Sequence, residues 1–249
     1  MVMLYFSATG NSKYIAELFC QNMNIPCHSI EEDNDFTNLI ASEDIICFCY
    51  PIYGSRVPRL MREFVVNHMV PLKNKKLIIF CTQMYFSGDG ARAFTDIFPC
   101  GFGEVVYAEH FLMPNNVCNL FITPLPGNRA IQKYLSKANR KMQIVCNNIK
   151  NGIIKKRGFT PASRALGLIQ GALFPRLENW AQGRVWVDSG CNKCLLCVSV
   201  CPAHNFEYIG DKIETKNNCM MCYRCINKCP QQAIAVFLRG KVKKQYAGV

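Results

Sequence analysis

Long apolar runs are missing from this sequence of 249 residues. A helix that crosses a membrane needs about 18 or more consecutive apolar residues, and no stretch here is that long. Residues 1–6 are too few for the apolar part of a signal peptide, and no basic segment precedes them, so we expect no export. Disulfides form mainly in exported proteins. We therefore expect a cytoplasmic protein whose 16 cysteines stay reduced.

Acidic residues are missing from residues 110–177. This region holds eleven basic residues, which are Arg129, Lys133, Lys137, Arg140, Lys141, Lys150, Lys155, Lys156, Arg157, Arg164 and Arg176. The rest of the chain is almost neutral, so the net charge of +12 arises here. No nucleic-acid-binding motif accompanies the charge, and we expect no nucleic acid as partner. The basic region is instead suited to an acidic redox protein, such as a soluble ferredoxin, or to a small anionic acceptor.

Eight of the cysteines form two runs of identical spacing, 28 residues apart. Both read C-x-x-C-x-x-C-x-x-x-C-P, and they comprise Cys191, Cys194, Cys197 and Cys201, then Cys219, Cys222, Cys225 and Cys229. A [4Fe–4S] cube takes one thiolate on each iron, and two-residue gaps allow three successive sulfurs to reach one cube. A zinc site made of two knuckles needs only two cysteines in each, and disulfides need export. The spacing therefore favours two [4Fe–4S] clusters over zinc or disulfides.

Residues 185–240, which contain both runs, closely resemble the bacterial two-cluster ferredoxins. In that arrangement each cluster takes its fourth ligand from the other run. The resemblance implies a small α+β domain with two clusters. One cluster would be held by Cys191, Cys194, Cys197 and Cys229, and the other by Cys219, Cys222, Cys225 and Cys201.

The first 112 residues alternate between short apolar segments and helical segments. Strands are predicted at residues 3–7, 27–30, 44–50, 77–82 and 104–112, and helices at 11–23, 59–68 and 91–98. A last helix is predicted at 129–150, with Lys133, Lys137, Arg140 and Lys141 on the face opposite its apolar residues. This alternation predicts an α/β fold with a doubly wound, five-stranded parallel sheet.

Three loops follow predicted strands, where ligands of such sheets bind. Residues 7–12 (SATGNS) connect a strand to a helix with hydroxyl groups and a glycine, which suits a phosphate group. A helix cap without ligand is the alternative for this loop. Residues 50–55 (YPIYGS) and 83–90 (QMYFSGDG) supply aromatic rings and glycines, which suit a ring system; ordinary packing is the alternative for each tyrosine.

The three loops, in this order, resemble the flavodoxin family over residues 1–150. The resemblance implies the strand order 2-1-3-4-5, an FMN phosphate in the first loop and the flavin ring between the other two, with Tyr53 and Tyr85 stacked on it. Neither of these loops contains tryptophan, which is a departure from the family. The implied FMN-binding residues are Ser7, Thr9, Gly10, Asn11, Ser12, Pro51, Ile52, Tyr53, Gly54, Gln83, Met84, Tyr85, Ser87, Gly88 and Asp89.

The whole chain is similar to a family from anaerobic microbes that joins a flavodoxin-like domain to a two-cluster ferredoxin. We predict an FMN domain at 1–152, a connector at 153–184 and a cluster domain at 185–249. Within the connector, residues 162–180 have a membrane-surface segment as the alternative. The clusters would reach the flavin of their own chain or of a second copy in a homodimer.

The predicted function is electron transfer between FMN and the clusters, which couples one- and two-electron steps. The alternatives are an FMN-dependent reductase of a small organic acceptor, with residues 113–128 as a pocket or lid, and a redox sensor. No catalytic triad or carboxylate pair stands out, so no catalytic residue is predicted.

Overall fold

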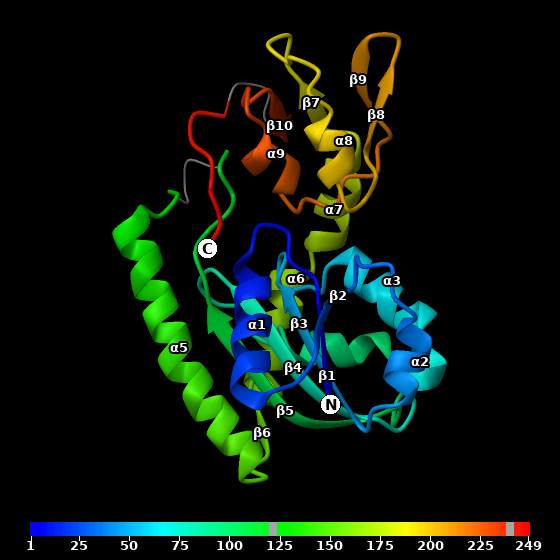
Figure 1. Ribbon diagram of the computed structural model, residues 1–249, viewed down its shortest axis with the longest axis vertical. Coiled ribbons are helices and arrows are strands. Elements are labelled where there is room, and N and C mark those ends of the chain that lie inside the picture. The colour runs from blue at the N-terminus through cyan, green and yellow to red at the C-terminus, as the bar shows by residue number, and fades with distance from the viewer. Residues whose placement is uncertain (120–123, 238–241) are drawn as a thin grey trace.

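The computed structural model describes residues 1–119, 124–237 and 242–249. A parallel sheet with helices on both faces forms its larger part, and the C-terminal elements lie beyond the carboxyl ends of its strands (Figure 1). Within the described residues, no helix is both long and apolar enough to cross a membrane. Parts of the predicted lid and of the predicted cluster domain, at 120–123 and 238–241, fall outside the described residues.

Six strands form the large sheet, and every neighbouring pair is parallel. In spatial order they are β2 (Cys27–Ser29), β1 (Val2–Tyr5), β3 (Ile45–Pro51), β4 (Lys76–Gln83), β5 (Glu104–Leu112) and β6 (Lys155–Lys156). The first five follow the predicted order 2-1-3-4-5, which is confirmed. Because the chain reverses its winding between β1 and β3, the loops that follow these strands open a crevice at their carboxyl ends.

The central strands are buried on both faces because their side chains are apolar at successive positions. On β3 and β4, Phe48 and Ile79 face one side of the sheet, whereas Cys49 and Phe80 face the other. All four are fully buried. Continuous apolar runs of this kind are typical of parallel strands covered on both sides.

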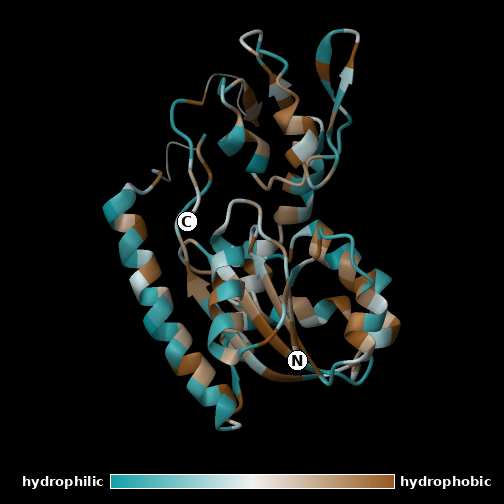
Figure 2. Cartoon of the chain, viewed as in Figure 1, coloured by the Kyte–Doolittle hydropathy of each residue, from teal (hydrophilic) through white to brown (hydrophobic). Residues whose placement is uncertain are grey.

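Helices cover both faces of the sheet. The first face carries α1 (Asn11–Met23) and α5 (Asn128–Lys150), and the second carries α2 (Phe36–Ala41), α3 (Arg59–Asn67), α4 (Met69–Leu72) and the 3₁₀ helix η1 (Arg92–Ile97). Figure 2 shows hydrophilic residues along the outer side of α5. Lys133, Lys137 and Arg140 are exposed there, as predicted for this amphipathic helix.

Three sequence predictions need correction. The sheet has six strands instead of five, because Lys155 and Lys156 pair with Tyr107 and Ala108 of β5. The helix predicted at 91–98 is a 3₁₀ helix. Lys141 does not share the exposed face of α5, since its Nζ lies 2.9 Å from Oε1 of the buried Glu109.

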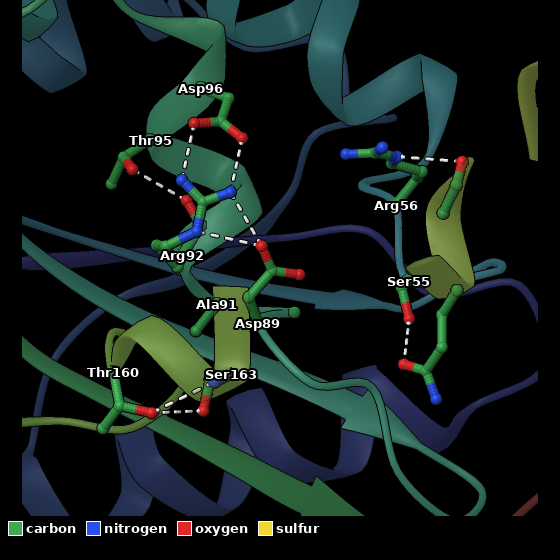
Figure 3. A network of polar contacts seen from close by, with 12 residues as sticks. Ser55, Arg56, Asp89, Ala91, Arg92, Thr95, Asp96, Thr160 and Ser163 are labelled. Carbon is green, nitrogen blue, oxygen red and sulfur yellow. Dashed lines mark hydrogen bonds and ion pairs between the residues drawn. The ribbon is translucent and has the colours of Figure 1, made fainter. Parts of the chain in front are cut away.

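The remaining elements follow β6. Two helices, α6 (Pro161–Gly171) and α7 (Phe174–Gln182), lead into a small α+β unit made of β7 (Val185–Val187), α8 (Leu196–Val200), β8 (Phe206–Ile209), β9 (Lys212–Thr215), α9 (Arg224–Lys228) and β10 (Ile234–Val236). In this unit β10 pairs antiparallel with β7, and β8 pairs antiparallel with β9. The helix α6 begins with Thr160 as its N-cap, whose Oγ1 accepts a 3.1 Å hydrogen bond from the Ser163 amide (Figure 3).

Candidate functional site: a cavity shared by the sheet loops and a cysteine run

A cavity of about 340 Å³ lies at the carboxyl ends of the sheet strands. Residues from all three predicted loops line it: Ser7, Thr9, Asn11, Ser12, Pro51, Ile52, Tyr53, Gly54, Gln83 and Met84. These loops follow β1, β3 and β4, which are adjacent in the sheet. The topology of the sheet thus brings together segments that are separated in the sequence.

The loop after β1 is arranged to receive an anionic group. Ser7 lines the cavity, and its hydroxyl is buried without a hydrogen-bond partner among the described residues. Gly10, with φ of 102°, precedes α1, and no side chain caps the first turn of that helix. Uncapped amides at a helix N-terminus and an unpaired hydroxyl are donors that a phosphate group would satisfy.

Other side chains of this loop are held by neighbours. Thr9 Oγ1 accepts a 3.1 Å hydrogen bond from Asn116 Nδ2, and Asn11 Nδ2 donates a 2.8 Å bond to the Pro114 carbonyl. The Ser12 hydroxyl lies 2.7 Å from that of Thr82 on β4. These contacts fix the shape of the loop before any ligand binds.

Arg224, which lies inside the second cysteine run, also fixes this loop. Its Nε donates a 3.0 Å hydrogen bond to the Ala8 carbonyl, and its Nη2 donates a 2.8 Å bond to the Ser7 carbonyl. The carboxylate of Glu31 accepts from both terminal nitrogens. Burial opposes the charge of Arg224, but the hydrogen bond and the negative charge of Glu31, together with Cys222 and Tyr53, outweigh it and raise the pKa of the guanidinium. The C-terminal unit is thereby joined to the candidate phosphate loop.

Some predicted residues lie outside the cavity wall. Tyr85 is 66% exposed, and Gly10, Ser87, Gly88 and Asp89 are not among the lining residues. Asp89 is buried and accepts from Arg92 Nη2 at 2.7 Å, and Arg92 also binds Asp96 (Figure 3). The Asp89 carboxylate therefore holds the end of its loop against η1 instead of facing the cavity.

The cavity also has walls that the sequence did not suggest. They come from Phe174 and Leu177 of α7, and from Met221, Tyr223 and Phe237. No local motif marks these residues, because each is brought to the cavity by the packing of a distant segment. Residues 113–117 belong to the predicted lid, and they do line the cavity.

The four cysteines assigned to the first cluster surround one space. Cys191, Cys194, Cys197 and Cys229 line a small cavity of about 10 Å³ with Leu195, Leu196, Ile213 and Ile234. Burial, with the nearby Cys191 and Cys229, raises the pKa of the Cys197 thiol to about 11. The last cysteine of the second run thus lies beside the first three cysteines of the first run.

The four cysteines assigned to the second cluster show the reciprocal grouping, with Cys201 of the first run beside cysteines of the second run. Burial raises the pKa of Cys222 to about 12, and Cys219 and Cys201 also raise it. Burial raises the pKa of the Cys225 thiol well above its usual value, and Cys222, Cys219, Cys201 and Cys197 add to the rise. Isolated thiols in these places would be protonated, whereas bound metal would favour the thiolate.

The two runs fold alike. Lys193 and Met221 each donate a backbone hydrogen bond of 3.4 Å to the sulfur of Cys191 and Cys219, respectively. Leu195 and Tyr223, also 28 residues apart, have φ of 61° and 62°. The amides of Asn205 and Ala233 donate to the sulfurs of Cys201 and Cys229 at 3.3 Å in both cases. Amide donors directed at sulfur stabilise thiolates.

The cysteine groups do not have the geometry of a single-ion site. In the part of the chain that the structure describes, no three His, Cys, Asp or Glu side chains are placed to hold one metal ion. A zinc ion draws all four thiolates around one centre, whereas a cube places each thiolate on a different iron.

The comparison with known families concerns the sheet and its loops. A model described as flavodoxin domain matches residues 2–150, more than half of the chain. The chain belongs to the flavodoxin family. The match ends at α5, so the connector and both cysteine runs lie outside the flavodoxin domain.

Solved structures similar to this chain include flavodoxins and a related protein. The Megasphaera elsdenii flavodoxin is 23% identical, with a TM-score of 0.40, and the similarity covers 57% of this chain and 99% of that one. General stress protein 14 of Treponema denticola, in complex with FMN, is 12% identical with a TM-score of 0.44, covering 59% and 97%. Flavodoxin 2 of Bacillus cereus is 14% identical with a TM-score of 0.41, covering 60% and 97%. Among curated proteins, none matches the chain.

The connector packs closely on two loops of the flavodoxin domain. The Ser55 hydroxyl donates to Gln170 Oε1 at 2.8 Å, and Arg56 Nε donates to the Gly171 carbonyl at 3.4 Å (Figure 3). A Cβ at Gly167 would lie 1.6 Å from Asp89 Oδ1. Glycine at this position therefore lets α6 approach the loop that ends the flavodoxin crevice.

Replacing Gly167 by alanine is expected to destabilise the protein by about 1–3 kcal/mol, because the new methyl group overlaps the fixed Asp89 carboxylate. Alanine is otherwise the better helix residue by about 1 kcal/mol, so a net loss would show that the overlap dominates. Denaturant unfolding measures the change. Gly183→Ala is the control, since its Cβ would make only an ordinary 3.7 Å contact with Asn217; equal stability of the two variants would contradict the close packing.

Proposed function

We propose that this chain binds FMN in the large cavity and two [4Fe–4S] clusters on its cysteine runs, and that it transfers electrons between them. FMN exchanges one or two electrons and each cluster exchanges one, so their combination couples two-electron and one-electron reactions. The domain limits that we propose are 1–152 for FMN, 153–184 for the connector and 185–249 for the clusters.

Binding of FMN is supported by family membership and by the loop after β1. The buried Ser7 hydroxyl and the uncapped N-terminus of α1 are free to bind a phosphate, and Thr9 lies beside them. The ring would occupy the space between Ile52–Gly54 and Gln83–Met84. Tyr53 lies in this wall, whereas the exposed Tyr85 would have to move in order to stack on the ring.

Binding of the clusters is supported by the grouping of the cysteines. Cys191, Cys194, Cys197 and Cys229 would hold one cube, and Cys219, Cys222, Cys225 and Cys201 the other. Amide hydrogen bonds to the sulfurs and the apolar lining of the first group suit buried thiolates. We call the second cube, beside the flavodoxin domain, the inner cluster, and the first cube the outer cluster.

One observation carries the proposal: the second cysteine run is part of the wall of the large cavity. Met221 and Tyr223 flank Cys222 in the sequence, and both line the space in which the flavin would lie. The inner cluster would therefore lie next to the flavin of its own chain. Direct transfer between the two groups then needs no second copy of the protein.

Metal and flavin analysis after anaerobic purification tests the proposal. We expect about eight irons, about eight inorganic sulfides and one FMN per chain, because two cubes hold four irons and four sulfides each. Metal is measured by mass spectrometry, sulfide by colorimetry and flavin by fluorescence after release. Zinc without sulfide would contradict the clusters, and a preparation that binds iron but no added FMN would contradict the flavin site.

A reductase of a small organic acceptor is the second candidate, because part of the cavity wall is apolar. Val117, Phe174, Leu177 and Phe237 line it beyond the flavodoxin loops. Such a wall would bind an uncharged or aromatic acceptor beside the flavin. Turnover of acceptors by the fully loaded protein with a reduced ferredoxin as donor would favour this reading, whereas exchange with protein carriers alone favours electron transfer.

We further propose that the basic outer face of α5 binds an acidic redox protein. Lys133, Lys137 and Arg140 are exposed, and none of them forms an ion pair with another described residue. Unpaired positive charge on one face attracts negatively charged partners and accelerates their association at low salt.

A further inference from the structure

The helices α6 and α7 turn small residues toward the protein and several large apolar residues away from it. Their buried positions recur every three or four residues, and they are Gly167, Gly171, Phe174, Glu178 and Ala181. A surface helix ordinarily buries its large apolar side chains and exposes polar ones. On α6 the two buried positions are glycines, so its larger apolar side chains are left on the outer side.

These outward side chains form an apolar stripe on α6 and on the link to α7. We define the stripe by Ala165, Leu168, Ile169, Ala172 and Leu173, all of which are exposed. Ile169 is 74% exposed and Leu173 is 63% exposed. The spacings of three and four residues place the stripe on one side of the helix. Contiguous exposed apolar surface of this kind marks a place that contacts another protein or a membrane.

Positive charge flanks the stripe, and no negative charge faces outward beside it. Arg164 and Arg176 are exposed, and neither forms an ion pair with another described residue. The one acidic residue between positions 161 and 182 is Glu178. It is buried, and its Oε2 accepts a 3.0 Å hydrogen bond from Arg62 Nη2. The outer surface of this segment therefore combines alkyl side chains with positive charge that is not neutralised.

We propose that α6 and the start of α7 lie on the surface of a bilayer that contains anionic lipid, with the apolar stripe in the headgroup region and Arg164 and Arg176 beside lipid phosphates. Amphipathic helices bind membranes through apolar burial together with attraction to anionic headgroups. The opposite side of α6 remains on the flavodoxin domain, where Ser55 donates to Gln170. The inference requires neither FMN nor clusters, because it uses only the surface of the connector.

Charge and chemistry distinguish a lipid surface from protein partners. A second copy of the chain would bring its own Arg164 and Arg176 to the same interface, together with a net charge of +12. An acidic protein would match the charge, but the stripe offers it only alkyl groups without a hydrogen-bonding atom. Protein interfaces carry about one hydrogen bond per 100–200 Å² and favour aromatic and arginine anchors. Fluid lipid makes no such directional demand, so it fits this surface better.

Sedimentation of the whole chain with lipid vesicles tests the proposal. We expect the wild type to bind vesicles of phosphatidylcholine with phosphatidylglycerol at least about tenfold more tightly than phosphatidylcholine alone, because each basic residue at an anionic surface strengthens binding about fivefold. Arg164→Gln with Arg176→Gln should weaken binding to the anionic vesicles about 25-fold by the same reasoning. Ile169→Glu with Leu173→Glu should weaken it at least about 100-fold, since two apolar side chains no longer enter the headgroup region.

Val66→Glu with Val70→Glu is the matched control. These valines are 54% and 88% exposed on α3 and α4, away from the stripe, and the variant changes the net charge equally. It should bind almost as tightly as the wild type, and circular dichroism checks that each variant is folded. Absence of wild-type binding to anionic vesicles would overturn the proposal, and so would equal binding by the Ile169 and Leu173 variant and this control. A wild-type dimer that Ile169→Glu with Leu173→Glu separates into monomers, measured by analytical ultracentrifugation without lipid, would assign the stripe to self-association and overturn it as well.

Discussion

Replacing Cys201 and Cys222 together by alanine is expected to leave about four of eight irons, whereas replacing Cys201 and Cys194 together should leave almost none. In the crossed arrangement Cys201 and Cys222 serve the same cube, so the first variant loses one cluster. Cys201 and Cys194 serve different cubes, so the second variant damages both. Iron and sulfide contents of the anaerobically purified variants measure the difference.

The two double variants control each other, because both lose Cys201 and one middle cysteine of a run. If each run held its own cluster, the result would be reversed, and the variant lacking Cys201 and Cys194 would keep four irons. Cys100→Ala supplies a further reference, since Cys100 is exposed and belongs to neither run. Its iron content should equal that of the wild type.

Replacing Thr9 by glutamate is expected to weaken FMN binding at least about 100-fold and to leave the iron content unchanged. Thr9 lies in the loop after β1 beside the unpaired Ser7 hydroxyl. A carboxylate there repels a phosphate a few ångströms away by about 4 kcal/mol at an intermediate effective dielectric, and each 1.4 kcal/mol is tenfold in affinity. Titration of flavin fluorescence measures the affinity, and iron analysis checks the clusters.

Thr9→Ser and Thr37→Glu separate charge from other effects. Serine keeps the hydroxyl that accepts from Asn116, so binding should change only slightly. Thr37 is exposed on α2, away from the cavity lining, and a glutamate there adds the same charge without facing a phosphate. Loss of FMN in all three variants, or of iron together with FMN in Thr9→Glu, would argue against a separate phosphate site.

Much of the fold follows from local sequence patterns. The apolar runs that became β1, β3, β4 and β5 are long enough to predict buried strands, and their alternation with helices predicts a parallel sheet. The order of the first five strands came from the resemblance to flavodoxins. The short helices α2 and α4 escaped prediction, because six and four residues are too few to show a helical period.

The sixth strand could not be predicted from the local sequence, and the reason is physical. Lys155 and Lys156 have neither the apolar character nor the alternation of a strand. They are held against β5 by backbone pairing and by Glu109, which binds Lys155 at 2.9 Å and Lys141 at the same distance. Such contacts join residues that are far apart in the sequence, so only the folded chain shows them.

The residues of the candidate site also fall into two groups, those that local motifs predicted and those that only the folded chain reveals. The loops after the strands were visible as motifs, whereas Phe174, Tyr223 and Phe237 reach the cavity only through tertiary packing. Asp89 shows a signal that could have been used. Acidic residues at 89 and 96 flank Arg92 at spacings of three and four, which on one helical turn predicts the ion pairs that the structure contains.

The two edge strands of the large sheet are short, and this affects how the protein could associate with itself. Unpaired edge strands are templates on which another chain can add a strand, a route to aggregates. Here β2 has three residues and β6 has two, both lysines and both exposed. Beyond β6, Arg157 donates to the Ala108 carbonyl and Gly158 lies against His110, so the chain continues to shield β5. Because these edge strands are short and the lysines of β6 would repel those of a second copy, extension of the sheet from one molecule into the next is disfavoured. Two associating copies would have to meet on another surface.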